Sequence, residues 1–201
     1  MLASLFIFHS GITSRGTIMK MKSIRYAFLG LFLTSTIAAA KTDVLSHQYR
    51  TLAGKEQVNF KKTYSGKVLL VVNTASKCGY TPQFEALEAL NAKYQSKGFA
   101  VLGFPSNDFM GQDPGSEKEI KEFCTLTYGV KFPMYEKVHV KGNNATGIYR
   151  DLKAVTGDEP GWNFHKFLID RKGNVIGSFP SKVKPDDAQI IAKIEAALAA
   201  K

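Results

Sequence analysis

The sequence predicts an α/β fold in which helices flank a mixed central sheet, with a β-hairpin ahead of it. Two nearly continuous apolar runs, at residues 67–73 and 99–104, are typical of strands that are buried on both faces. Segments with apolar residues at helical spacing alternate with these runs, and two short strand-like segments follow near the end of the chain. Alternation of this kind predicts a sheet that is covered by helices on both sides.

The first part of the predicted fold is a hairpin, a strand and a helix. Residues 44–60 alternate between apolar and polar side chains around residues 53–55, which indicates a short hairpin. The first buried strand follows at residues 67–73. A helix is expected over residues 82–98, because proline suits its first turn, glycine suits its end, and apolar residues recur between them at helical spacing. Those apolar residues are Phe84, Leu87, Leu90 and Tyr94.

The second buried strand, at residues 99–104, leads into a polar, glycine-rich loop over residues 105–115. Ser116 and Glu119 then have the spacing of a capping box, in which each side chain binds the backbone N–H of the other residue. A helix is therefore expected from there to about residue 126.

The last third of the chain completes the sheet. A short helix is expected over residues 146–155, and two strands at residues 163–169 and 175–179 are joined by the turn residues 170–174. A helix over residues 185–200 closes the chain. The resulting order, strand–helix–strand–helix–strand–strand–helix, is that of the thioredoxin-like fold.

Length and composition are those of one soluble globular domain. The chain has 201 residues, of which 44% are hydrophobic and 22% are charged. Residues 1–40 hold four basic residues and no acidic one, so without them the formal net charge falls from +10 to +6. A surplus of this size steers anionic partners toward a protein. The sequence has no arginine-rich run or basic helix face, and no nucleic-acid partner is expected.

The first forty residues have the layout of a secretory signal peptide. A basic stretch at residues 19–25 precedes an apolar run at 26–37 and three alanines that end at Ala40. The apolar run is shorter than the roughly 20 residues that span a bilayer, so cleavage after Ala40 is favoured over an uncleaved anchor and no stable membrane insertion is expected. The mature protein is expected to be periplasmic or secreted.

Residues 1–18 lie upstream of this complete signal peptide and contribute no part of its pattern. We therefore expect translation to start at Met19 or Met21. Residues 1–40 are left out of the fold, and residues 41–201 are expected to form a single domain.

The two cysteines of the chain, Cys78 and Cys124, are the first candidates for chemistry. In an exported protein they could form a structural disulfide. Cys78, however, lies in the turn between a buried strand and a helix, where unpaired N–H groups and the helix dipole stabilise a thiolate, and Lys77 adds a positive charge. Position alone leaves a reactive and a structural thiol equally favoured.

Three stretches of sequence resemble the glutathione peroxidase family. They are residues 73–81 (Asn-Thr-Ala-Ser-Lys-Cys-Gly-Tyr-Thr), residues 104–116 (Phe-Pro-Ser-Asn-Asp-Phe-Met-Gly-Gln-Asp-Pro-Gly-Ser) and residues 162–168 (Trp-Asn-Phe-His-Lys-Phe-Leu). They occur in order and at the family's spacing, and the resemblance covers residues 66–200.

The resemblance implies that Cys78 is the peroxidatic residue of a thiol peroxidase. The catalytic partners that it implies are Gln112, Trp162 and Asn163. Two amides and an indole N–H donate hydrogen bonds to a thiolate and to a peroxide oxygen without being oxidised themselves. Trp162, taken alone, is better explained as a core aromatic, and the neighbouring motif favours the site. No metal or organic cofactor is expected, because the implied thiol chemistry needs none. The histidines, His9, His47, His139 and His165, show no metal-ligand spacing.

The implied reaction converts Cys78 to a sulfenic acid, which two thiols then return to the thiol. Cys124 lies where thioredoxin-dependent members carry a resolving cysteine, but about one residue out of register, so a buried bystander thiol is nearly as well supported. The short approach to Trp162 lacks the insertion of the tetrameric, glutathione-selective members. The resemblance therefore implies a monomer that reduces hydrogen peroxide and organic or lipid hydroperoxides, with a thioredoxin-like protein favoured over glutathione as reductant.

Two other functions use the same fold. A disulfide oxidoreductase normally needs a Cys-x-x-Cys pair, and here the residue three positions after Cys78 is Thr81. A non-catalytic redox-sensing or binding protein is the second alternative, and the presence of all four site residues argues against it.

Overall fold

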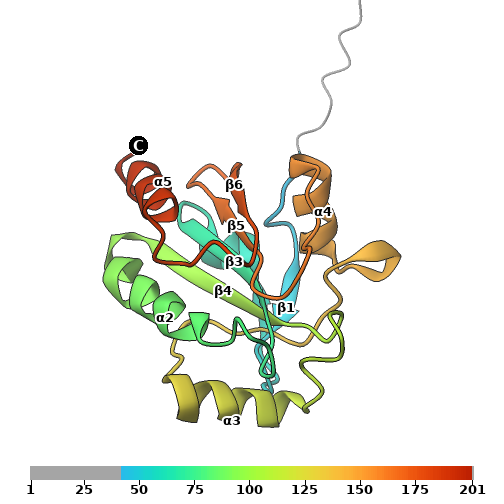
Figure 1. Cartoon of the computed structure of the whole chain (residues 1–201). Coiled ribbons are helices and arrows are strands. Elements are labelled where there is room, and N and C mark those ends of the chain that lie inside the picture. Colours follow the sequence, from blue (N-terminus) through green and yellow to red (C-terminus); the bar gives the residue numbers. More distant parts are fainter. Residues whose placement is uncertain (1–41, 201) are drawn as a thin grey trace, which may run out of the picture. The chain divides into compact units, whose positions relative to one another are not determined.

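The computed structural model describes residues 42–200. The expected signal peptide, the expected start at Met19 or Met21 and the expected cleavage after Ala40 all lie outside these residues. In the described part a mixed four-stranded sheet lies between helices, and an antiparallel hairpin precedes it (Figure 1). This is the α/β architecture that the sequence predicts.

The sheet has the strand order β4-β3-β5-β6. Strands β3 (Val68–Thr74) and β4 (Phe99–Pro105) are parallel, whereas β5 (Lys166–Ile169) is antiparallel to β3 and β6 (Val175–Phe179) is antiparallel to β5. Every residue of β3, β4 and β5 is buried. The continuous apolar runs therefore form central strands, as expected for a sheet with helices on both faces.

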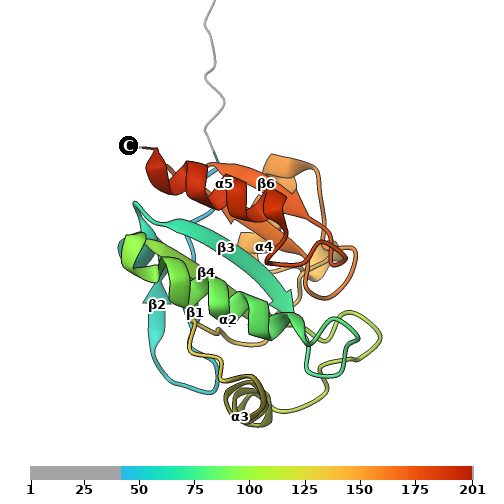
Figure 2. The ribbon, with the colours of Figure 1, turned by 60° about the vertical axis from the view of Figure 1, so that its left-hand side comes forward.

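Alternate residues of β3 contact different helices. Val68, Leu70 and Val72 belong to the core that α2 and α5 cover, and these two helices lie on the same side of the sheet (Figure 2). Leu69 and Val71 belong to the second core, which α1 and α4 cover. The helices are α1 (Phe60–Tyr64), α2 (Gln83–Tyr94), α3 (Glu117–Tyr128), α4 (Gly147–Thr156) and α5 (Ala188–Ala199).

The predicted N-terminal hairpin is confirmed. Strand β1 (Gln48–Arg50) pairs antiparallel with β2 (Gln57–Asn59). The backbone N–H of Leu52 donates a hydrogen bond to the carbonyl of Met134 at 2.9 Å, which attaches the hairpin to the segment after α3.

The helix ends follow the signals in the sequence. The capping box of α3 is present, since Ser116 and Glu119 each bind the backbone N–H of the other. Helix α2 follows Pro82 and continues as a 3₁₀ turn, Gln95–Lys97, which ends at Gly98 with φ of 87°. Only glycine adopts that left-handed conformation without steric cost.

Two element boundaries were predicted too early in the sequence. The strand expected over 163–169 begins only at Lys166, because Phe164 has φ of 63° and its N–H donates to the carbonyl of Asn73 at 2.6 Å. Residues 163–165 therefore form a turn. The helix expected over 185–200 begins at Ala188, because the Asp187 side chain accepts a hydrogen bond from the N–H of Gln189 and caps the helix there.

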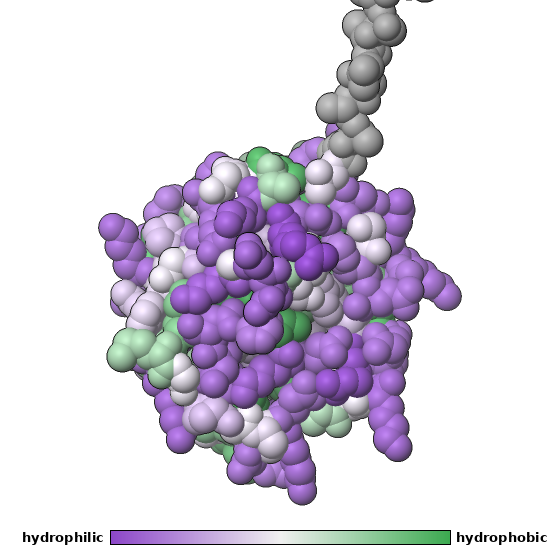
Figure 3. All heavy atoms as spheres, turned by 90° about the vertical axis from the view of Figure 1, so that its right-hand side faces the viewer, coloured by the Kyte–Doolittle hydropathy of each residue, from purple (hydrophilic) through white to green (hydrophobic). Residues whose placement is uncertain are grey.

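The surface of the described part is mostly polar. The face shown in Figure 3 is predominantly hydrophilic, with small hydrophobic patches. Between residues 42 and 200, the large hydrophobic side chains that are exposed are Met110, Leu126 and Val155. No helix within this range is long and apolar enough to cross a membrane.

Candidate active site

Cys78 lies in the turn that connects the end of β3 to the start of α2, as the sequence predicts. Its side chain is half-buried, and the backbone N–H of Tyr80 points at its sulfur with an N–Sγ distance of 3.4 Å. The turn is held by Thr81, whose hydroxyl accepts a hydrogen bond from the N–H of Cys78 at 3.0 Å and donates one to the carbonyl of Ala75 at 2.9 Å. The sulfur is thus partly accessible, and one backbone N–H, that of Tyr80, is directed at it.

The glycine-rich loop that carries Gln112 is fastened to the Cys78 turn. The N–H of Lys77 donates to the carbonyl of Gln112 at 2.9 Å. The buried Asp113 carboxylate accepts hydrogen bonds from the N–H of Ser76, at 3.0 Å, and from its hydroxyl. Burial raises the pKa of Asp113. Gln112 is therefore held beside the residues that directly precede Cys78.

The side chains of Gln112 and Asn163 meet in the structure. The Asn163 amide donates to Oε1 of Gln112 at 3.0 Å. Asn163 is fully buried, and its own amide oxygen has no hydrogen-bond partner. The pair joins the glycine-rich loop to the turn that precedes β5.

Asn73 positions the turn that contains Trp162 and Asn163, and sequence reasoning missed this residue. From the end of β3 its side chain donates to the carbonyl of Trp162 at 3.1 Å and accepts from the N–H of His165, also at 3.1 Å. The available signal was an asparagine at the end of an otherwise apolar strand, within the motif at residues 73–81. Asn73 thereby links β3, which leads to Cys78, with the turn that precedes β5.

Trp162 is half-buried and lies against Phe109, with ring centroids 5.5 Å apart. It also lines a cavity of about 560 Å³, together with Tyr80 and His165. Pro180, Ser181 and Lys182 form another wall of this cavity. Burial lowers the pKa of His165 to about 4, so this imidazole is neutral at pH 7. Trp162 is therefore neither a pure core residue nor a surface one, since one part of it packs and another faces a cavity.

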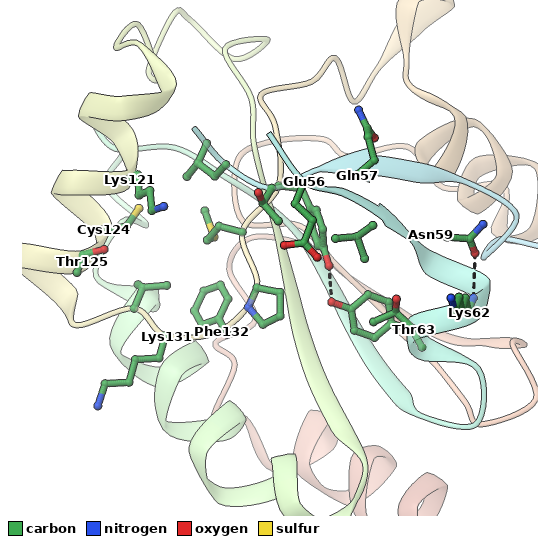
Figure 4. Close-up of a pocket in the computed structure, with 18 residues that line it drawn as sticks. Glu56, Gln57, Asn59, Lys62, Thr63, Lys121, Cys124, Thr125, Lys131 and Phe132 are labelled. Atoms are coloured by element: carbon green, nitrogen blue, oxygen red, sulfur yellow. Dashed lines mark hydrogen bonds between the residues drawn. The ribbon is translucent and has the colours of Figure 1, made fainter. Parts of the chain in front are cut away.

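Cys124 is in a different environment from Cys78. It lies on α3 with 2% of its surface exposed, and both cysteines are free thiols. Burial raises the pKa of Cys124 to about 12, and the Asp113 carboxylate adds to this shift. Cys124 lines a second cavity, of about 770 Å³, between α3, the hairpin and residues 130–135, where Figure 4 shows it beside Lys121. Cys78 is not among the residues that line this cavity.

The histidines of the described part make ordinary hydrogen bonds. Their partners are Asp151 for His47, Asp108 for His139 and Ser178 for His165. Within residues 42–200 no group of three or more histidine, cysteine, aspartate or glutamate side chains is arranged to hold a metal ion.

Comparison with known proteins gives consistent relatives. Residues 44–153 match the family model described as glutathione peroxidase. The glutathione peroxidase-like peroxiredoxin 2 of Saccharomyces cerevisiae is 52% identical over 125 residues, which cover 60% of this chain and 77% of the relative. The glutathione peroxidase-like peroxiredoxin gpx1 of Schizosaccharomyces pombe is 47% identical over 149 residues, covering 71% and 94%. The hydroperoxy fatty acid reductase gpx1 of Synechocystis is 46% identical over 144 residues, covering 67% and 84%.

Solved structures agree with these sequence matches. The crystal structure of Trgpx in apo form has a TM-score of 0.62 at 34% identity and covers 78% of this chain and 96% of its own. The structure of T. cruzi GPX1 has a TM-score of 0.60 at 30% identity, with the same coverage. A putative thiol:disulfide interchange protein DsbE from Chlorobium tepidum, at 22% identity and a TM-score of 0.53, shares the fold. The predicted thioredoxin-like fold is confirmed.

Proposed function

Because the chain belongs to the glutathione peroxidase family and is an oxidoreductase that acts on peroxides, we propose that Cys78 is the residue that attacks the peroxide. The Cys78 thiolate attacks the terminal oxygen of ROOH, an S–O bond forms, and the O–O bond breaks. The alcohol ROH leaves after taking up a proton, and the sulfur becomes a sulfenic acid. The sulfur is thereby oxidised by two electrons and the peroxide is reduced by two.

Gln112, Trp162 and Asn163 serve as the hydrogen-bond donors of this reaction. Asn163 occupies Oε1 of Gln112, so the NH₂ group of Gln112 remains to donate to the sulfur or to the peroxide oxygen. The indole N–H of Trp162 is a donor without any acceptor capacity. Donors placed in advance at an oxygen that gains negative charge lower the barrier for breaking the O–O bond.

One observation carries this proposal: the Gln112–Asn163 pair is tied to the Cys78 turn from two sides. The Lys77–Gln112 backbone bond holds the first residue of the pair, and Asn73 holds the turn that contains the second. Residues from three distant stretches of sequence are thus placed around one strand end. A protein that only kept the fold would not need this arrangement of uncharged donors.

The sulfenic acid is returned to the thiol by a thioredoxin-like protein or by glutathione. Two relatives carry the name peroxiredoxin and one is named a hydroperoxy fatty acid reductase, which supports thiol recycling and lipid hydroperoxides as substrates. The first thiol condenses with the sulfenic acid, water leaves, and a second thiol breaks the resulting disulfide. Cys124 is the candidate for the first thiol within this chain. We propose a monomer that takes its electrons from such a donor in oxidative defence.

We further propose that this reaction takes place outside the cytosol, in the periplasm or after secretion. The support is the basic, apolar and small-residue pattern of residues 19–40. Sequencing the N-terminus of the exported protein tests it, and Lys41 is the expected first residue. A mature protein that retains residues 26–37 contradicts cleavage.

The test of the function is peroxide consumption by the purified protein. A thioredoxin system and glutathione are supplied as reductants in separate assays, with hydrogen peroxide and with a lipid hydroperoxide. We expect turnover with at least one donor and a Cys78 sulfenic acid, or a disulfide, in the mass spectrum after one equivalent of peroxide. A folded protein that turns over with neither donor is instead the redox-sensing or binding protein of the alternative.

A further inference from the structure

Lys166 is a buried lysine at the first position of β5, three residues after Asn163. It has 0% of its surface exposed. Its ammonium donates to Oε1 of Gln83 at 2.7 Å and to the carbonyl of Val183 at 2.6 Å, with the carbonyl of Ser181 at 3.5 Å. Within residues 42–200 no carboxylate forms an ion pair with it, and burial lowers its pKa to about 7.

A buried ammonium without a counter-ion costs free energy, and an apolar side chain at this strand position would avoid that cost. Hydrogen bonds to three neutral oxygens offset this cost only when all three oxygens are arranged around the same nitrogen, which requires their segments to keep fixed relative positions. Lys166 is therefore better suited to fixing the relative position of its partners than to adding stability.

The partners of Lys166 lie on two separate segments. Gln83 is the first residue of α2, and its N–H donates to the carbonyl of Tyr80 at 2.9 Å. The Gln83 amide also donates to the carbonyl of Ser181 at 2.7 Å. Lys166 and Gln83 together thus join the start of α2, the start of β5 and residues 181–183.

These same segments form the walls of the 560 Å³ cavity beside Trp162. Tyr80 comes from the turn before α2, Trp162 and His165 come from the turn before β5, and Ser181 comes from the third segment. Two aromatic rings, a proline and a neutral imidazole make most of these walls apolar, and the charged residues Glu159 and Lys182 complete the lining. An organic group of moderate size fits such a cavity. The cavity lies near the Cys78 turn in the chain, since Tyr80, one of its walls, is two residues after Cys78.

We propose that this cavity receives the organic group of an alkyl hydroperoxide, and that Lys166 is the positioning residue that holds its walls. The inference rests on the peroxidase function proposed above and deepens it. Hydrogen peroxide has no organic group, so of the cavity walls it needs only the indole N–H of Trp162, whose turn is also held by Asn73. The two peroxides should therefore respond differently when Lys166 is changed.

The test is the ratio of two rate constants in the Lys166→Met variant. The reduced protein is mixed with cumene hydroperoxide or hydrogen peroxide, and oxidation is followed by the fluorescence of Trp162, which is the only tryptophan in the chain. We expect the rate constant for cumene hydroperoxide to fall about 10-fold and that for hydrogen peroxide to change less than about 3-fold, since only the first needs the positioned walls. An unchanged ratio, or an equal fall in both rate constants, overturns the proposal.

Arg171→Met is the matched control. Arg171 also binds carbonyls from separate segments, those of Gly66 at 2.7 Å and Lys97 at 2.8 Å, but at the opposite end of the sheet. It should lower the melting temperature without changing the ratio. If Lys166→Met does not fold, Gln83→Met removes the shared partner and is expected to change the ratio in the same direction.

A binding experiment separates this inference from the catalytic one. In a Cys78→Ser protein, cumyl alcohol is titrated while the fluorescence of Trp162 is recorded. We expect saturable binding that Lys166→Met weakens several-fold, and absence of binding contradicts the cavity assignment. A wild-type protein that reacts with neither peroxide contradicts the proposed function instead, whatever the outcome of the titration.

Discussion

The two cysteines of this chain show how position relative to a helix decides what a thiol can do. Cys78 is half-buried just before α2, with the N–H of Tyr80 directed at its sulfur. Cys124 lies within α3, where the helix satisfies the backbone and burial raises the pKa of its thiol to about 12. Both belong to the same hydrophobic core, one at its edge and one inside. A cysteine in the turn before a helix, with a backbone N–H directed at its sulfur, is better suited to nucleophilic attack than one packed inside a helix.

The largest effect is expected from Cys78→Ser. A hydroxyl is not ionised at neutral pH and cannot replace the thiolate, so peroxide reduction should fall by at least about 1,000-fold. The measurement is the rate of peroxide loss under saturating reductant. Cys124→Ser is the control and should keep the first turnover, in which only Cys78 is oxidised. If peroxide reduction survives in Cys78→Ser and is lost in Cys124→Ser, then Cys124 and not Cys78 is the residue that attacks the peroxide.

The next effect is expected from Asn163→Ala and Gln112→Ala. Each removes one member of the side-chain pair beside the Cys78 turn, and the rate constant for peroxide should fall about 100-fold, as for the loss of a positioned donor at a charged transition state. Stopped-flow oxidation of the reduced protein gives this rate constant directly. A change below about 3-fold in both variants would show that the pair only supports the turn.

Cys124 should react slowly with alkylating reagents while the protein is folded. At pH 7.5 we expect iodoacetamide to alkylate Cys124 at least about 30-fold more slowly than Cys78, because the thiol of Cys124 is both buried and protonated. Peptide mass spectrometry measures both sites, and in urea the two rates should converge. Equal rates in the folded protein contradict the structural contrast.

The resolving role of Cys124 is tested with the same residue. If Cys124 forms a disulfide with Cys78, α3 must first unwind or shift, because the two Cα atoms have to come within about 7 Å. Cys124→Ser should then lose most of its thioredoxin-dependent turnover, about 10-fold, while the first oxidation stays unchanged. Full thioredoxin-dependent activity in this variant removes the resolving role.

The smallest effect concerns the stability of the segment that holds Cys124. Two hydrogen bonds from Arg50 to Glu117, at 2.7 and 2.8 Å, join the hairpin to the first turn of α3. They also lower the pKa of Glu117 to about 2. A lowered pKa in the folded state contributes stability above the unfolded value of 4.5, and this contribution is lost as the pH falls toward 2.

Glu117→Gln should therefore lower the free energy of unfolding at pH 7 by about 1–2 kcal/mol, and the difference from wild type should shrink as the pH falls. Urea titrations at several pH values measure this. Iodoacetamide should also alkylate Cys124 faster in this variant, because α3 is attached less firmly to the hairpin. A pH-independent difference would mean that the Arg50–Glu117 pair is not its cause.

Much of the fold and part of the site were predictable from local sequence. Ser116 and Glu119 specify the start of α3 by themselves, since the capping box involves only neighbouring backbone groups. The apolar run that becomes β3 indicated a strand buried on both faces, with Cys78 in the turn that follows. The start of β5 was not predictable in this way, because the positive φ of Phe164 depends on a bond to Asn73, ninety-one residues earlier in the chain.

By itself, the sequence determined the order of the elements, the place of Cys78 before a helix and the family motifs around it. Periodicity, caps and turns depend on residues close in the chain, and these are visible without a structure. Only the tertiary structure decided that Asn163 meets Gln112, that Cys124 is buried and that Lys166 binds two other segments. Those properties depend on which distant segments the sheet brings together, and no local pattern specifies them.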